Sequence, residues 1–228
     1  MGTGAQEPAL AIEGLERHYG DRIALAGVTL SLPVGATLAV FGANGAGKTT
    51  LLRVLATLLR PHGGSVTALD ASLPDDAWRL RGRVGYLAHE ALLYRDLTPR
   101  ENLLLHARLH GLPAARVDEL IAQVGLARRA GDRVRDLSRG MVQRVAAARA
   151  VIHDPPLLLL DEPRAGLDPG AAARLEPLIG RESGRTRVLV THDVDAGLAE
   201  CDLALGLKLG RQVFCGRATA DEVRELYR

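Results

Sequence analysis

A glycine-rich segment between an apolar run and a helical run constrains this chain more than any other feature. The segment GANGAGKTT, residues 42–50, matches the pattern G-x-x-x-x-G-K-[ST]. The apolar run at residues 38–41 predicts a strand directly before it, and the run LLRVLATLL predicts a helix directly after it. A glycine-rich turn with an incidental lysine is the alternative. The flanking strand and helix favour a phosphate-binding loop.

Each part of this segment has a physical role in holding phosphate. Glycines let backbone N–H groups converge on phosphate oxygens, and the following helix N-terminus adds positive potential. Lys48 brings a compact charge to the β and γ oxygens, a task for which the planar arginine fork is poorly suited. Only Lys48 and Lys208 among the 29 basic residues are lysines. The expected nucleotide contacts are Gly42, Asn44, Gly45, Ala46, Gly47, Lys48, Thr49 and Thr50, with the Thr49 hydroxyl also available to Mg²⁺.

Composition and charge narrow the class of protein. A chain of 228 residues that is 47% hydrophobic and 25% charged predicts one globular domain over residues 1–228. The net charge of +2 and the aromatic content of 3% predict no nucleic-acid partner. No apolar stretch approaches the roughly 20 residues of a spanning helix, and the first ten residues lack a leader, so we expect a cytoplasmic protein. Cys201 and Cys215 lack metal-ligand spacing and are expected to be reduced, structural thiols.

Short apolar runs alternate with helical patterns along the chain, which is typical of α/β packing around a largely parallel sheet. Capping boxes at Thr98 and Thr219 predict two helix starts, and residues 101–151 are predicted to be mostly helical. The predicted strands are residues 10–13 and 28–32 in an antiparallel portion, residues 37–41, and residues 157–160 and 188–190 as buried central strands.

Two adjacent carboxylates, Asp161 and Glu162, follow the predicted strand at residues 157–160. In an open α/β sheet, ligands bind at the carboxyl ends of the strands. Asp161 is therefore placed to hold Mg²⁺ through water, and Glu162 is placed to orient and deprotonate an attacking water. Such a pair can also merely cap the next helix, and the phosphate-binding loop upstream favours the catalytic interpretation.

His192 follows the next predicted strand, residues 188–190, and so emerges at the same edge of the sheet. A lone histidine more often has a structural role than a functional one. Its place relative to the phosphate-binding loop predicts a contact with the γ-phosphate.

The segment LSRGM, residues 137–141, precedes a helical run at residues 142–151 with Ser138 as the expected N-cap. A hydroxyl, the glycine Gly140 and a helix N-terminus together make a second anion site. An ordinary capped helix is the alternative, and these residues alone leave it open.

The order and spacing of these segments resemble the ABC ATPase family over essentially the whole chain. LSRGM is similar to the family signature L-S-G-G-Q at Leu137, Ser138 and Gly140, and it departs from the signature at Arg139 and Met141. The resemblance implies that Ser138 and Gly140 contact the γ-phosphate of an ATP molecule bound to the opposite subunit.

The same resemblance assigns roles to further residues. It implies that Tyr19 stacks on adenine and that Asp168, in the segment AGLD, links the two sites across a dimer. It implies Glu162 as the catalytic base and His192 as the switch histidine, beside Lys48 in the phosphate-binding loop.

His89 stands where the family has its Q-loop glutamine, which senses Mg²⁺ and water and contacts the membrane subunit. The segment YLAH, residues 86–89, is similar to the haem-exporter ATP-binding subunit of the cytochrome c maturation system. A cytoplasmic coupling contact or a neutral hydrogen-bonding histidine is favoured for His89 over ligation of haem iron. LSRGM also resembles cassettes of drug and ABC-2-type exporters.

The resemblance implies a RecA-like P-loop fold with an antiparallel β portion and a helical signature subdomain at roughly residues 85–150. It implies an ATPase that binds ATP and Mg²⁺, works as a cassette dimer and drives separate membrane subunits from the cytoplasmic face of the inner membrane. The alternatives to a haem exporter are an exporter of drugs, a soluble ABC ATPase such as one for iron–sulfur assembly, and a simple P-loop kinase. In a simple kinase, LSRGM and AGLD would have no role.

Overall fold

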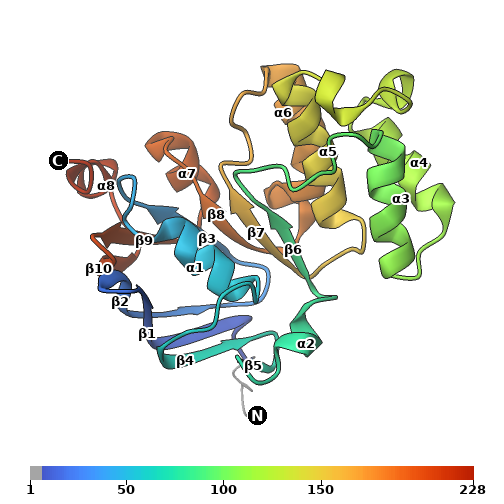
Figure 1. The fold of residues 1–228 in the computed structure, drawn as a ribbon. Helices are drawn as coiled ribbons and strands as arrows, with labels where there is room; N and C mark the ends of the chain where they lie inside the picture. Colours follow the sequence, from blue (N-terminus) through green and yellow to red (C-terminus); the bar gives the residue numbers. More distant parts are fainter. Residues whose placement is uncertain (1–6) are drawn as a thin grey trace, which may run out of the picture.

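The computed structural model describes residues 7–228, which form two β-sheets with helices packed on them (Figure 1). The expectation about a leader rests partly on residues 1–6, which lie outside the described residues. The structure confirms an α/β core with an antiparallel β portion and a helical portion. Between residues 7 and 228 there is no helix with the length and apolar character needed to cross a bilayer.

The first sheet is antiparallel, with the strand order β2-β1-β4-β5. Its strands are β1 (Leu10–Tyr19), β2 (Arg22–Leu32), β4 (Gly63–Ala68) and β5 (Ala71–Leu73). Strands β1 and β2 pair as predicted but are longer than predicted. The register between them shifts after Ile12, where Gly14 has a φ of +59°, and a bulge of this kind interrupts the period-two pattern from which strand length is predicted.

The second sheet has the order β10-β9-β3-β8-β7-β6, and all its pairs are parallel except β10 with β9. Its strands are β3 (Thr37–Phe41), β6 (Val84–Leu87), β7 (Leu157–Asp161), β8 (Thr186–Val190), β9 (Leu203–Lys208) and β10 (Arg211–Gly216). Every residue of β3, β7 and β8 is buried, and the apolar runs at residues 38–41, 157–160 and 188–190 lie within these strands. The predicted strands at residues 37–41, 157–160 and 188–190 are confirmed.

Alternate residues of β7 face two different cores. Leu157 and Leu159 join a cluster between the two sheets that includes helix α1, while Leu158 and Leu160 join a cluster formed with the helical portion. The central sheet therefore separates the antiparallel sheet from the helices α3, α4, α5 and α6, as Figure 1 shows.

Helices begin after the predicted N-caps Thr98, Ser138 and Thr219, and the described residues contain eight α-helices. They are α1 (Lys48–Leu55), α2 (Ala77–Leu80), α3 (Pro99–Leu109), α4 (Ala114–Gln123), α5 (Arg139–Val151), α6 (Pro169–Ile179), α7 (Val194–Glu200) and α8 (Ala220–Glu225), with short 3-10 turns at Ala127–Arg129, Val134–Asp136 and Arg181–Ser183. Both predicted capping boxes are present, at Thr98 before α3 and at Thr219 before α8.

The helical portion begins later than the expected boundary near residue 85. Residues 84–87 form β6, which pairs with β7 in the central sheet, and the first helix after it begins at Pro99. A run of four residues is too short for a period to distinguish strand from helix, so pairing with β7 decides its structure. The helices of this portion extend from residue 99 to residue 151.

Candidate functional site

The glycine-rich segment, which we call the P-loop (residues 42–50), connects the carboxyl end of β3 to the start of α1. A Cβ atom on Gly42 would lie 2.2 Å from the carbonyl oxygen of Leu207 in β9, and one on Gly47 would lie 2.4 Å from that of Ala24 in β2. Gly47 also has a φ of +107°. These glycines therefore let the loop pack tightly against both sheets, in addition to exposing its N–H groups.

Lys48 is the first residue of α1 and is 7% exposed. Its ammonium donates hydrogen bonds to the carbonyl oxygens of Gly42 at 2.6 Å and Ala43 at 3.0 Å. Burial lowers the pKa of Lys48, while the nearby carboxylates of Glu162 and Asp161 act in the opposite direction. The positive charge of Lys48 therefore lies at the P-loop, where it would attract an anion such as a phosphate group.

Asp161 ends β7 beside Thr49, whose Oγ1 donates to Asp161 Oδ2 at 3.0 Å. The hydroxyl and the carboxylate are the oxygen ligands that Mg²⁺ prefers, and Asp161 is only 3% exposed. Within residues 7–228, no group of three or more His, Cys, Asp or Glu side chains is arranged to hold a metal. The pair fits an ion that takes its other ligands from phosphate oxygens and water.

Glu162 follows Asp161 in a backbone conformation with a φ of +54°, which non-glycine residues rarely adopt. Its N–H donates to Val190 O at 3.0 Å, which ties it to β8. Burial and the adjacent charge of Asp161 raise the pKa of Glu162 to about 7, against the opposing effect of Lys48. Its Oε1 is buried and has no hydrogen-bond partner within the described residues. Such an oxygen is suited to accept a proton from a water molecule.

His192 follows β8, and its Nε2 lies 3.5 Å from Oε1 of Glu162. The two atoms do not form a hydrogen bond. Burial and the charge of Lys48 lower the pKa of His192, so the ring is neutral near pH 7. The ring centroid of Tyr227, near the carboxyl end of the chain, lies 6.3 Å away. Tyr227 Oη also accepts a hydrogen bond from the N–H of Gly42 at 3.4 Å, a contact that no sequence motif indicates.

A cavity of about 440 Å³ brings most of the predicted residues together. It is lined by Tyr19, Asn44, Gly45, Ala46, Gly47, Lys48, Thr49, Thr50, His89, Asp161, Glu162 and His192, together with Arg22, Ala24, Arg53 and Val190. The two arginines add positive charge that the sequence analysis did not identify. Arg53 stands four residues after Thr49 on α1, a helical spacing that indicates the same face.

Tyr19 and His89 lie at the exposed side of this cavity. Tyr19 is 43% exposed. The guanidinium carbon of Arg17 lies 5.2 Å from the centroid of the Tyr19 ring. His89 follows β6 and is exposed.

The signature segment (residues 137–141) and Asp168 lie elsewhere, since none of them lines this cavity. Ser138 is the N-cap of α5, and its Oγ accepts a hydrogen bond from Met141 N at 3.3 Å. Asp168 caps α6 by accepting from Ala171 N at 2.9 Å. The predicted N-cap is confirmed, and Ser138 is exposed.

Gln143, which the sequence analysis did not identify, connects α5 to the acidic pair. Its Nε2 donates to the carbonyl oxygens of Pro163 at 3.3 Å and Glu162 at 3.5 Å, and the residue is 9% exposed. The helix that begins at the signature segment therefore touches the backbone of Glu162.

The chain is similar to several known proteins and matches one protein-family model. The family model described as ABC transporter matches residues 25–165. The chain is 38% identical to the daunorubicin resistance ATP-binding protein DrrA3 of Streptomyces coeruleorubidus, over 96% of this chain and 70% of that protein. It is 37% identical to the Nod factor export ATP-binding protein I of Ralstonia nicotianae, over 92% of this chain and 67% of that protein. Among solved structures, a dimeric post-hydrolysis ATP-binding cassette bound to ADP and Pi has a TM-score of 0.80 and 26% identity, covering 91% of this chain and 98% of that one.

Proposed function

Because this chain belongs to the ABC transporter family and is an ATPase of that family, we propose that it powers export through separate membrane subunits. The cavity that gathers the P-loop, the acidic pair and His192 is the observation that carries the proposal. The names of the relatives DrrA3 and Nod factor export protein I support the direction of transport. We place the protein peripherally on the cytoplasmic face of the membrane that holds those subunits.

The P-loop half of the site binds ATP. Lys48 and the loop N–H groups hold the phosphates, Arg22 and Arg53 add charge, and Tyr19 stacks on adenine. Thr49 and, through water, Asp161 would hold Mg²⁺, which would neutralise charge on the phosphate oxygens.

Hydrolysis uses the second carboxylate. Glu162 takes a proton from the attacking water, a role that its pKa of about 7 suits because a general base works best with a pKa near the operating pH. The neutral His192 beside it is placed to contact the γ-phosphate. His89, where the family has a glutamine, lines the same cavity and serves as a hydrogen-bonding contact towards the membrane subunit.

Two copies complete each site. Ser138, Gly140 and Asp168 are absent from the chain's own cavity, and the solved post-hydrolysis cassette with a TM-score of 0.80 is a dimer. We infer that the signature segment contacts the γ-phosphate held by the P-loop of the other copy, so that ATP joins the two subunits and hydrolysis releases them.

For the cargo we favour a drug over haem. The haem interpretation depends on the segment at residues 86–89, whereas two relatives, at 38% and 37% identity over most of this chain, are named for daunorubicin resistance and Nod factor export. A third relative, at 38% identity and with 48% of its length covered, is named for phosphonates import.

The decisive experiment is purification of the tagged full chain from solubilised membranes, followed by reconstitution of the recovered complex in liposomes. We expect membrane subunits to copurify and daunorubicin to stimulate ATP hydrolysis, with Glu162→Gln as the inactive control. Stimulation by haem alone would restore the haem-export interpretation. Recovery of soluble assembly proteins without membrane subunits would contradict transport.

A further inference from the structure

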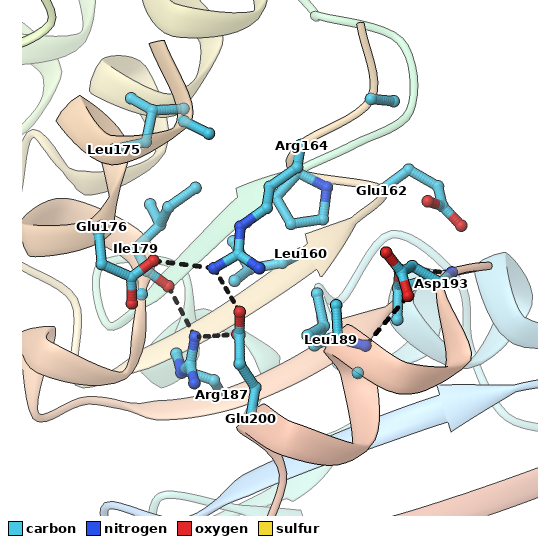
Figure 2. A pocket seen from close by; sticks show the side chains of 17 residues that line it. Leu160, Glu162, Arg164, Leu175, Glu176, Ile179, Arg187, Leu189, Asp193 and Glu200 are labelled. Carbon is cyan, nitrogen blue, oxygen red and sulfur yellow. Dashed lines mark hydrogen bonds and ion pairs between the residues drawn. The ribbon is translucent and has the colours of Figure 1, made fainter. Parts of the chain in front are cut away.

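Four charged side chains form a connected network next to the acidic pair, which we call the arginine–glutamate network (Arg164, Glu176, Arg187 and Glu200). Arg164 Nη2 contacts Glu176 Oε2 at 2.8 Å and also the carboxylate of Glu200. Arg187 Nη1 contacts Glu200 Oε2 at 3.2 Å. Figure 2 shows Arg164 extending from its loop to both carboxylates, while Glu162 points to the opposite side.

The network is anchored in the protein interior. The Arg187 side chain is 1% exposed and also donates to Thr37 Oγ1 at 3.2 Å and to Ile179 O at 3.1 Å. The Glu200 side chain is 16% exposed, and that of Arg164 is 44% exposed. Exposed ion pairs contribute little, but Arg164 reaches a carboxylate whose position is fixed by a buried arginine.

A cavity of about 260 Å³ lies between this network and the loop that follows Glu162. The loop residues Pro163 and Ala165 line it, as do the apolar side chains of Leu160, Leu175 and Leu189. Because the cavity leaves one side of the loop without packing partners, close-packed side chains do not hold the loop on that side. On that side, Arg164 connects the loop to α6 through Glu176 and to α7 through Glu200.

Glu200, which binds Arg164, and Arg187, which binds Glu200, belong to the elements that flank His192. Arg187 lies in β8, Glu200 is the last residue of α7, and the turn that contains His192 connects these two elements. A bond from Arg164 to Glu200 therefore ties the loop of Glu162 to the unit that presents His192. Nε2 of His192 lies 3.5 Å from Oε1 of Glu162.

We propose that Arg164 is a positioning residue that fixes Glu162 relative to His192 by binding Glu176 and Glu200 across this cavity. The inference rests on the proposed role of Glu162 in hydrolysis. Arg164 touches neither the nucleotide cavity nor the reacting atoms. Its effect on turnover is exerted through the loop alone.

The first test is steady-state ATP hydrolysis by the full chain. We expect Arg164→Ala to lower kcat by about ten- to a hundredfold, the cost of misplacing a catalytic group by about 1 Å, with KM for ATP changed less than about twofold. Arg164→Lys, which keeps the charge, should recover most of the activity. Arg100→Ala is the matched control, because Arg100 makes a similar pair with Asp118, is 45% exposed and lies on α3 outside the site.

The second test removes one carboxylate partner of Arg164. Glu176→Gln breaks the contact at 2.8 Å and leaves the buried Arg187–Glu200 pair intact. Its kcat should fall in the same direction as in Arg164→Ala but by a smaller factor, with KM for ATP again changed less than about twofold. This variant keeps the inference testable if Arg164→Ala folds poorly.

Two outcomes would overturn the inference. One is a wild-type kcat in both Arg164→Ala and Glu176→Gln, and the other is a change in KM alone. Comparison with Glu162→Gln separates the two hypotheses: unchanged turnover in that variant removes the proposed base, whereas its loss beside an active Arg164→Ala removes only the positioning role. Adding Arg164→Ala to Glu162→Gln should give no further loss, because the group being positioned is gone.

Discussion

The P-loop and the signature segment differ in how far a single chain completes them. Lys48 is 7% exposed, is bonded to two carbonyl groups of its own loop, and lies in a cavity with the acidic pair. Ser138 is exposed, and its Oγ accepts one bond from its own helix at 3.3 Å. The first region lines a cavity with the residues predicted to bind nucleotide, and the second is an exposed helix start.

This difference separates binding from turnover. The P-loop is shaped by contacts with β2 and β9 of the same chain. The signature segment begins α5, and its Leu137 and Met141 pack against the helical core, whereas the Ser138 side chain is exposed and so available to a ligand held by another molecule. Changes on the P-loop side should therefore abolish binding, and changes on the signature side should lower hydrolysis alone.

The largest effect should come from Lys48→Ala. We expect no measurable ATP binding at micromolar nucleotide, because the loop N–H groups cannot replace a full charge at the β and γ phosphates. Equilibrium binding of a fluorescent ATP analogue measures this loss. The control is Lys208→Ala, because Lys208 is the second lysine of the chain and is exposed. Retained micromolar affinity in Lys48→Ala would refute the P-loop assignment.

Glu162→Gln should keep ATP binding and lower turnover by about 10²- to 10⁴-fold, the usual contribution of a positioned general base. The same variant should accumulate as an ATP-bound dimer, because closure no longer ends in hydrolysis. Light scattering with and without ATP measures the mass. A protein that remains monomeric in ATP would contradict the two-copy site.

Ser138→Arg should lower hydrolysis by about 10²-fold, comparable to the loss of one donor at a developing charge, while ATP affinity stays within a factor of about two. The bulky side chain would fill the space in front of the α5 N-terminus that the partner's γ-phosphate requires. ATPase rate and nucleotide affinity, measured on the same preparation, give the two quantities.

A mixture of Ser138→Arg and Lys48→Ala makes the comparison sharper. A mixed dimer pairs an intact P-loop from the first variant with an intact signature segment from the second, so partial activity should return. Full hydrolysis by Ser138→Arg alone would reduce LSRGM to an ordinary helix cap.

The smallest expected effect concerns pH. Glu162 must be deprotonated to act as a base, and its pKa is raised to about 7, so kcat should fall about tenfold for each pH unit below that value. Ser138→Arg should lower the whole profile without moving its acid limb, since the signature segment lies outside the cavity of Glu162. A moved limb in Ser138→Arg would show that the two regions are not separable.

The predicted elements were those with strong local signals. Capping boxes at Thr98 and Thr219 and the continuous apolar runs of β3, β7 and β8 are confirmed, because each depends on neighbouring residues along the chain. Strand β6 was assigned to the helical portion, and β1 was predicted too short. In β6 only pairing with β7 decides the structure, and in β1 a bulge at Gly14 hides the alternation.

The sequence by itself determined the P-loop, the acidic pair and the capped signature helix, because each needs particular residue types at fixed short spacings beside a strand end or a helix start. The tertiary structure alone decided which distant side chains meet: Thr49 with Asp161 across 112 positions, Gln143 with the backbone of Glu162, and Arg164 with Glu200. The physical reason is that such contacts depend on how sheets and helices pack, and hydrophobic periodicity specifies only which face of an element is buried.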